Sequence, residues 1–162
     1  DHFGLKADRL HFGGTFSKAF GAHGGIVPGT AELVKTIRAG HIMNGASAGS
    51  SATAAAAIKG MELLTAHPEW RERLERNGRQ LKAGLRQLGF EMNDSPVPVA
   101  AWRLKSGADM DRVQAELLRR GILIQRTHYV AAGPEGALRA VVFSTHTPEQ
   151  IDRLLNELKK LV

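Results

Sequence analysis

The stretch Thr15–Gly24, with the sequence TFSKAFGAHG, surrounds one lysine with small and flexible residues. Gly13 and Gly14 precede this stretch, and glycine lets a backbone approach a bulky ligand closely. A lysine amine becomes a Schiff-base nucleophile where its surroundings favour the neutral form. Thr15, three residues before Lys18, is well placed to hold a phosphate. Lys18 is therefore the first candidate for chemistry, although spacing alone leaves a surface lysine in a glycine-rich turn as an equal alternative.

All ten positions of Thr15–Gly24 also fit a known signature. The pattern is Thr, an aromatic or aliphatic residue, Ser or Gly, Lys, a small residue, an apolar residue, a small residue, two free positions and a small residue. The chain thereby resembles the class II pyridoxal-phosphate-dependent aminotransferase-like enzymes. Among these it is most similar to the α-oxoamine synthases, which include 8-amino-7-oxononanoate synthase and glycine C-acetyltransferase. The resemblance extends to Ser144–Gln150 and the last helix, so it covers nearly the whole chain.

We call Thr15–Gly24 the lysine loop, and the resemblance implies roles for three of its residues. Lys18 would form the internal aldimine with pyridoxal 5′-phosphate, and Thr15 would donate its hydroxyl to the cofactor phosphate. Ser17 is a further cofactor-binding candidate. The cofactor would act as an electron sink for a carbanion, and the released amine of Lys18 would be the general base for the substrate α-proton. For Thr15, the alternative is an ordinary residue at the end of a strand.

The segment that would bind the substrate departs from the family pattern at one position. The α-oxoamine synthases usually carry Arg-apolar-Arg in the penultimate strand, where the second arginine grips the amino-acid carboxylate by a bidentate pair. Here Arg139 matches the first arginine, and Val141 stands at the second. Arg139 is therefore the substrate-binding candidate, with Arg126 as another possible source of the grip. The departure at Val141 makes a class I/II aminotransferase a credible second reading.

Two further segments resemble functional parts of the family. The segment 41–51 lies where the family reaches the cofactor phosphate of the neighbouring subunit through Ser or Thr. Asn44 or Ser47 would have to make that contact here, and a helix N-cap role for Ser47 is at least as good an interpretation. His146 lies at a turn that the family marks with His-Thr, and we interpret it as a local capping residue. The seven histidines are dispersed, so we expect no metal site.

The composition limits the remaining function classes. The chain has 162 residues, 43% hydrophobic residues, 23% charged residues and a formal net charge of +6, which fits a folded domain. Its basic residues alternate with Glu in helical patterns, which is typical of solvated faces rather than nucleic-acid interfaces. No run approaches the roughly 18 apolar residues of a membrane helix. Because the chain has no cysteine and nothing resembles a signal peptide, we expect a cytoplasmic protein.

Hydrophobic periodicity predicts an α/β fold. The resemblance implies a fold type I pyridoxal-phosphate transferase: residues 1–66 as the C-terminal part of the large domain, 67–89 as a linking helix and 90–162 as a small C-terminal α/β domain. In Ser47–Ala66, small residues predict a helix packed on several sides. We expect the strand at Val97–Leu104 to lie at an edge because of its prolines. The other expected strands are Leu10–Phe12, Gly25–Gly29, Phe90–Met92, Ile122–Ile124 and Leu138–Ser144, and the other expected helices are Ala31–Arg38, Pro68–Leu88, Met110–Leu118 and Thr147 onward.

Three functions follow as hypotheses. The first is part of an acyltransferase that condenses an amino acid with an acyl-CoA with loss of carbon dioxide, acting as a homodimer when complete. The second is a pyridoxal-phosphate-dependent aminotransferase. The third is a structural or interaction domain that is inactive alone. No nucleic-acid or membrane partner is expected for any of them.

The third hypothesis leads to a prediction about the chain by itself. A complete enzyme of this family is more than twice as long, and the resemblance implies that its upstream part holds the Asp that pairs with the pyridine nitrogen and the His that stacks on the ring. Without a carboxylate beside the pyridine nitrogen, the cofactor would be a poor electron sink. We therefore expect the 162-residue chain to bind pyridoxal phosphate weakly and to turn nothing over. A stoichiometric yellow adduct that borohydride traps on this chain would contradict that expectation.

Overall fold

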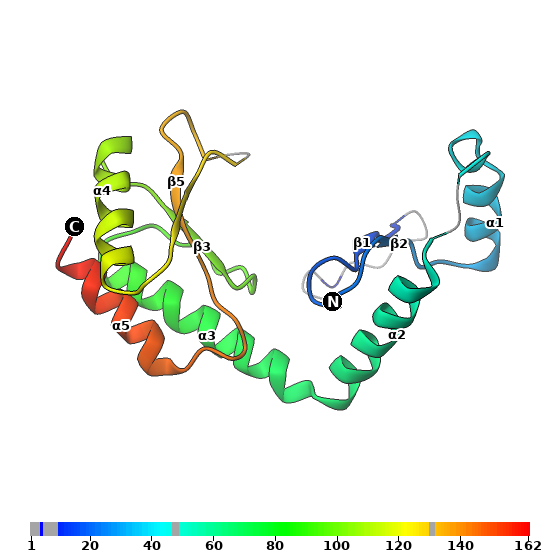
Figure 1. Ribbon diagram of the computed structural model, residues 1–162, viewed down its shortest axis with the longest axis horizontal. Helices are drawn as coiled ribbons and strands as arrows, with labels where there is room; N and C mark the ends of the chain where they lie inside the picture. The colour runs from blue at the N-terminus through cyan, green and yellow to red at the C-terminus, as the bar shows by residue number, and fades with distance from the viewer. Residues whose placement is uncertain (1–3, 5–9, 47–48, 130–131) are drawn as a thin grey trace. The chain divides into compact units, whose positions relative to one another are not determined.

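The computed structural model describes residues 4, 10–46, 49–129 and 132–162. The chain divides into two compact units, Asp1–His67 and Pro68–Val162. Each unit has its own arrangement of helices and strands, labelled in Figure 1. The assignment of 1–66, 67–89 and 90–162 to parts of a larger enzyme remains a prediction.

The first unit begins with a two-stranded antiparallel ribbon. Strands β1 (Gly14–Thr15) and β2 (Gly25–Ile26) pair so that Gly14 faces Ile26 and Thr15 faces Gly25. The sequence predicted a first strand that ends at Leu10–Phe12, which is wrong: these residues belong to no strand, and the ladder starts at Gly14. Strand signals report extended apolar residues, whereas pairing depends on a partner within reach, here β2.

Three helices complete this unit: α1 (Ala31–Ala39), the 3-10 helix η1 (His41–Met43) and α2 (Ser51–Ala66). The predicted cap of α1 is confirmed, since Thr30 Oγ1 accepts a hydrogen bond from Leu33 N at 3.2 Å. The predicted packing of α2 on several sides is wrong in this chain. Among the described residues of the unit, only Ala57 is buried. Small side chains bury little area unless another backbone comes close.

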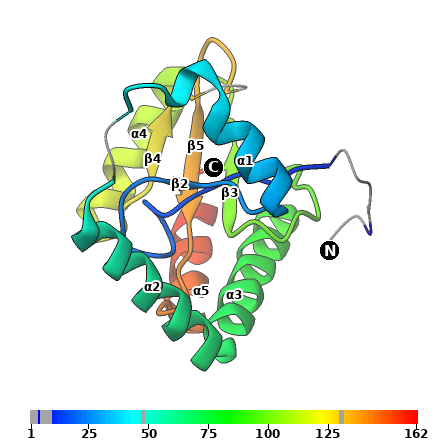
Figure 2. The same cartoon turned by 90° about the vertical axis from the view of Figure 1, so that its right-hand side faces the viewer.

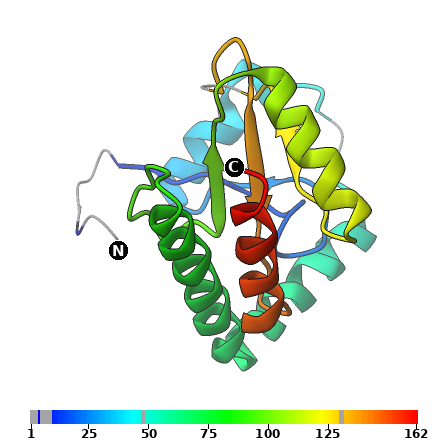
Figure 3. The same cartoon turned by 90° about the vertical axis from the view of Figure 1, so that its left-hand side faces the viewer.

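The second unit is a three-stranded antiparallel sheet with three helices. Strands β3 (Val99–Trp102), β4 (Gln125–Thr127) and β5 (Ala137–Val141) lie in the order β3-β5-β4, visible in Figure 2. The predicted edge position of the strand after Pro96 and Pro98 is confirmed. Helices α3 (Pro68–Gln87), α4 (Gly107–Arg119) and α5 (Pro148–Lys159) all lie on one face of the sheet (Figure 3).

The core of this unit lies between that face and the helices. Successive side chains of a strand point to opposite faces, and on β5 this places Leu138 and Ala140 in the core. Arg139 and Val141 consequently lie on the opposite face. The largest fully buried side chains of the core are Leu81, Leu85, Met110, Val113, Leu117, Leu138 and Leu158.

Capping fixes where α5 begins. The Thr147 hydroxyl accepts from Gln150 N at 3.3 Å, and the Gln150 side chain accepts from Thr147 N at 3.0 Å. This reciprocal pair is a capping box, followed by Pro148 in the first turn. The start of the last helix, predicted at Thr147, is therefore confirmed.

The predicted strand at Phe90–Met92 is wrong: Phe90 N donates to Leu85 O of α3 at 3.1 Å, and cationic side chains of α3 bind the carbonyls of Met92 and Ser95. Arg86 donates to Met92 O at 3.1 and 3.3 Å, and buried Lys82 donates to Ser95 O at 2.5 Å. Burial lowers the pKa of the Lys82 ammonium and nearby Arg86 lowers it further, while Asp94 opposes both. Residues 90–95, here called the strap, are thus held on α3 by hydrogen bonds.

The predicted strand at Ile122–Ile124 is also wrong. These residues follow Gly121, whose φ of 73° turns the chain out of α4, and the ladder begins only at Gln125. Ile124 is buried while Leu123 is 74% exposed. A run of three apolar residues therefore does not indicate strand pairing here. Among the described residues, no helix is both long and apolar enough to cross a membrane.

The core predicts a large contrast between two adjacent leucines of α4. Leu117 is fully buried and Leu118 is 56% exposed. We expect Leu117→Ala to lower the free energy of unfolding of the second unit by about 3 kcal/mol, since it removes packing and leaves a cavity. Leu118→Ala should change it by less than about 0.5 kcal/mol. Urea unfolding followed by the fluorescence of Trp70 and Trp102, both in this unit, measures both effects, and equal effects would contradict this description of the core.

Candidate active site

The lysine loop is a closed hairpin between β1 and β2. Phe16 N donates to Gly24 O at 2.9 Å, and Ala22 N donates to Phe16 O at 3.0 Å. Gly21 and Gly24 have φ values of 60° and 105°, which side-chain-bearing residues rarely adopt. These two glycines therefore set the path that turns the loop around Lys18.

The hydroxyl of Thr15 is used inside this loop. Its Oγ1 accepts a hydrogen bond from Ser17 N at 3.1 Å and donates to Gly24 O at 3.3 Å. The second bond is long for a hydroxyl donor and correspondingly weak. Thr15 thus stabilises the loop, and the exposed hydroxyl gives up little if it turns toward another acceptor.

Lys18 itself is exposed near the tip of the hairpin. Its carbonyl accepts from Gly21 N at 3.1 Å, which tightens the turn. Within the described part of the chain, its ammonium has no ion pair or hydrogen-bond acceptor. The rings of Phe16 and Phe20 pack edge to face, with centroids 5.3 Å apart and an interplanar angle of 82°. The loop therefore has a braced base and a free amine.

Gly60 of α2 positions the loop, and the sequence reasoning missed it. A Cβ at Gly60 would lie 2.7 Å from Phe20 O, closer than side-chain carbons approach an oxygen. Only glycine therefore lets the loop backbone lie on α2 at this height. The available signal was a single glycine inside an alanine-rich helix, since such a residue usually has a packing reason.

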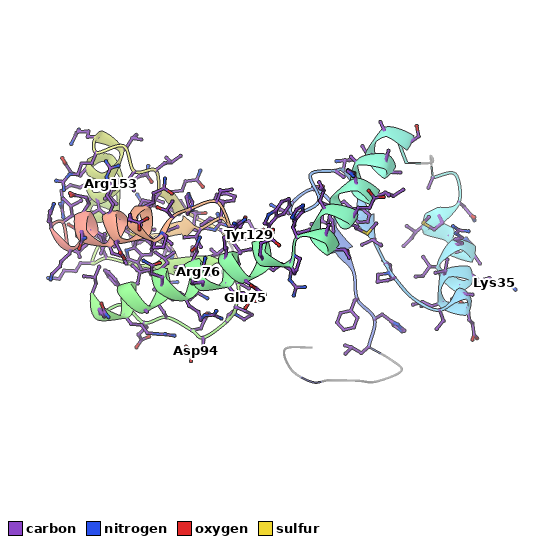
Figure 4. All side chains as sticks on the ribbon, turned by 90° about the horizontal axis from the view of Figure 1, so that it is seen from below. Lys35, Glu75, Arg76, Asp94, Tyr129 and Arg153 are labelled. Atoms are coloured by element: carbon purple, nitrogen blue, oxygen red, sulfur yellow. The ribbon has the colours of Figure 1, made fainter. Side chains whose placement is uncertain are left out.

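The predicted substrate residue lies in the second unit. Arg139 is half-buried in the central strand β5, opposite Ala101 of β3 and Gln125 of β4. It lines a concavity of about 600 Å³, together with Tyr129, which is labelled in Figure 4. No described residue pairs with its guanidinium. An arginine guanidinium without a partner can bind a carboxylate by donating two parallel hydrogen bonds to it.

The alternative arginine is already engaged. Arg126 Nη1 lies 2.6 Å from Asp111 Oδ2, and its Nε and Nη2 donate to Glu135 O at 3.0 and 2.9 Å. Arg126 also lies opposite Leu138 and so belongs to the helix-covered face. Val141 shares the face of Arg139 and pairs with Val99. Between the two arginines, only Arg139 has a guanidinium free for a ligand.

The remaining candidates are separate from these residues. Asn44 is exposed at the end of η1, where its N–H donates to His41 O at 3.1 Å, and Ser47 lies outside the described residues. His146 Nδ1 accepts from Phe143 N at 3.0 Å, which is a local backbone contact of the kind expected. Across the described residues, no three His, Asp or Glu side chains are grouped to hold a metal ion.

Comparison with known proteins identifies the family. The sequence profile of aminotransferase class I and II matches residues 2–158. A serine palmitoyltransferase solved with a pyridoxal-phosphate internal aldimine superposes with a TM-score of 0.83 and 27% identity, over 98% of this chain and 41% of that one. The fold is thus that of the fold type I pyridoxal-phosphate transferases, as predicted. The chain belongs to the aminotransferase class I and II family.

Within this family, the relatives are α-oxoamine synthases, as the resemblance indicated. The 8-amino-7-oxononanoate synthase of Lysinibacillus sphaericus is 32% identical over 170 residues, covering 99% of this chain and 42% of that protein. The enzyme of Methylococcus capsulatus is 34% identical over 166 residues, covering 100% and 43%. The Francisella tularensis enzyme shares the fold, with a TM-score of 0.79 over 93% of this chain and 45% of its own, at 21% identity. The chain spans about two fifths of the length of these curated relatives.

The contact at Gly60 yields a prediction with a matched control. We expect Gly60→Ala to push the lysine loop off α2, because the new methyl group meets rigid backbone, at a cost of roughly 1–3 kcal/mol. Gly78→Ala in α3 meets Pro98 only at an ordinary 3.4 Å, so helix propensity should make it neutral or stabilising. Hydrogen exchange of the Phe16 and Ala22 amides reports the loop. Unchanged exchange in Gly60→Ala would refute this role.

Proposed function

We propose that this chain is part of a pyridoxal-phosphate-dependent acyltransferase that condenses an amino acid with an acyl-CoA and releases carbon dioxide. Lys18 is the residue that bonds covalently to the cofactor. The observation that carries the proposal is the free amine of Lys18 on a braced hairpin whose ten residues fit the family signature. The 8-amino-7-oxononanoate synthases and serine palmitoyltransferases among the relatives support this reaction class.

The residues of the loop fit the cofactor. Pyridoxal phosphate needs an amine for its aldehyde and hydrogen-bond donors for its phosphate. Lys18 supplies the amine, and the exposed Thr15 hydroxyl, which accepts a bond from Ser17 N, donates its own proton only in a long bond to Gly24 O. Ser17 is exposed beside them, and no hydrogen bond of its hydroxyl occurs within the described residues. These three side chains therefore form the cofactor-binding set of this chain.

Each of these residues then has a task in the reaction. Thr15 and Ser17 hold the phosphate and so fix the ring relative to the hairpin. When bound, the cofactor supplies an electron sink for negative charge at the substrate α-carbon. The Lys18 amine would be the point of covalent attachment and, when free, would take the substrate α-proton as general base. Its exposure on a glycine-rich turn gives the amine the freedom that both roles require.

Arg139 is the proposed site for the substrate carboxylate. Its guanidinium is free, half-buried and surrounded by Val99, Ala101 and Val141 on the same face of the sheet. Low-polarity neighbours strengthen a charge-assisted pair.

The alternative is an aminotransferase, which Val141 favours because it stands where the synthases carry their second arginine. Assays of thiol release from acyl-CoA against formation of a keto acid separate the two reactions.

The working form of the enzyme is part of the same proposal. We infer a homodimer in the cytoplasm for the complete enzyme, with acyl-CoA and an amino acid as substrates. The chain alone would be an inactive structural piece, because a single buried residue, Ala57, occurs among the described residues of its first unit. A unit with so little buried apolar area cannot hold a rigid active site.

The decisive test replaces Lys18 in the complete enzyme. We expect Lys18→Ala to abolish the visible absorbance of lysine-bound pyridoxal phosphate and to lower kcat by at least about a thousandfold, since it removes both the covalent link and the base. Lys35→Ala is the matched control, because Lys35 projects from α1 at the surface (Figure 4). An unchanged spectrum in Lys18→Ala would leave the interaction-domain hypothesis standing.

A further inference from the structure

The turn at residues 143–146, which follows strand β5, is closed by hydrogen bonds between Phe143 and His146. His146 N donates to Phe143 O at 3.2 Å, and Phe143 N donates to His146 Nδ1 at 3.0 Å. The two rings also pack edge to face, with centroids 5.4 Å apart. Backbone and side chain of His146 therefore bond the same residue, Phe143, which fixes the turn from both directions.

A buried amide on α3 holds the outside of this turn. Asn77 is 1% exposed, and its Nδ2 donates to Phe143 O at 2.9 Å and to His146 O at 2.8 Å. Both protons of that amide are used, so its position is fully specified. One turn further along α3, Gln80 Nε2 donates to Pro148 O at 3.1 Å. The turn and the start of α5 are thus fixed to a core helix.

This turn has a large influence on β5 because the strand loses its neighbour on one side. The ladder with β4 ends where Arg139 faces Gln125, whereas the ladder with β3 continues through Val141. Val142 N then donates to Pro98 O at 3.1 Å on the β3 side. Beyond Arg139, the strand is therefore held by β3 and by the turn at its end. The position of that end sets the strand segment from which Arg139 projects.

The chemistry of the closure specifies the state of the ring. Nδ1 can accept the Phe143 N–H only when it carries no proton, so the imidazole is neutral with its proton on Nε2. Imidazolium has donors at both nitrogens, and its Nδ1–H would face the Phe143 N–H. Among the charged residues on the elements that adjoin the turn are Arg153, which lines a cavity of about 360 Å³ together with His146; Glu149 and Asp152 of α5; and Arg73 and Arg76 of α3. Arg153 donates to Arg120 O and Asp152 accepts from Gln80, while α3 also presents the neutral amides Asn77 and Gln80.

We propose that neutral His146 is a positioning residue for Arg139, which it holds in place by closing the turn at the end of β5, and that protonation of His146 releases this closure. The functional weight rests on the carboxylate role of Arg139 proposed above. The positioning itself is a property of the second unit and is measurable without cofactor or substrate.

The test uses the 15N-labelled 162-residue chain and two substitutions of similar size. His146→Asn keeps a side-chain oxygen near the position of Nδ1, whereas His146→Gln places its polar atoms farther out, near Nε2. We expect His146→Gln to speed hydrogen exchange of the Phe143 amide roughly fivefold, from loss of one hydrogen bond, and to shift the Arg139 Nε resonance. His146→Asn should stay within about twofold of the wild type in exchange and leave the Arg139 signal in place.

Ring and side-chain spectra of the wild type complete the test, and they decide it if His146→Gln fails to fold. Long-range 1H–15N spectra should place the proton on Nε2, and the Arg139 Nε signal should move with the His146 titration. A proton on Nδ1, an Arg139 signal independent of that titration, or equal behaviour of the two variants would overturn the proposal. A complete enzyme without lysine-bound cofactor would refute the proposed function and leave these results untouched.

Discussion

The burial of one face of strand β5 is the constraint on which the second unit depends. Leu138 and Ala140 enter the core with the leucines of α3, α4 and α5, and the alternation of the strand then sends Arg139 to the other face. A shift of one residue in register would reverse both placements. The apolar core thus determines the face of β5 from which Arg139 projects. Hydrogen bonds from α3 hold the chain on both sides of the sheet strands: Lys82 binds Ser95 before β3, and Asn77 binds Phe143 after β5.

The first unit is stabilised by different interactions from the second. Its hairpin is stabilised by local backbone bonds, two glycines with positive φ and the aromatic pair of Phe16 and Phe20, rather than by a core. Gly60 lets the hairpin backbone at Phe20 lie close to α2. This arrangement suits a residue that must bond covalently and also move, because a lysine on a rigid, buried element would lack the second property. It also explains why the whole enzyme, and not this chain, is proposed to be active.

Family membership and local geometry support the proposed chemistry in different ways. The matches extend over nearly the whole chain and establish the fold and the family. They leave the substrate open, because the chain spans about two fifths of the relatives. Local geometry then contributes what similarity does not: Arg126 is bound to Asp111 and Glu135, so Arg139 alone of the two remains for a carboxylate.

The sequence by itself determined the lysine loop, the family, the caps at Thr30 and Thr147 and most helices, because these depend on residues close together along the chain. The tertiary structure alone decided the register that separates Arg139 from Arg126, the use of Phe90–Met92 as a strap, and the loss of pairing at Ile122–Ile124. It also revealed the contact at Gly60 and the closure by His146. The strand register and the contact between Gly60 and Phe20 depend on partners in other elements, about which local propensity carries no information. The strap and the closure by His146 join residues closer in sequence, but they rest on side-chain hydrogen bonds that a hydrophobic pattern does not report.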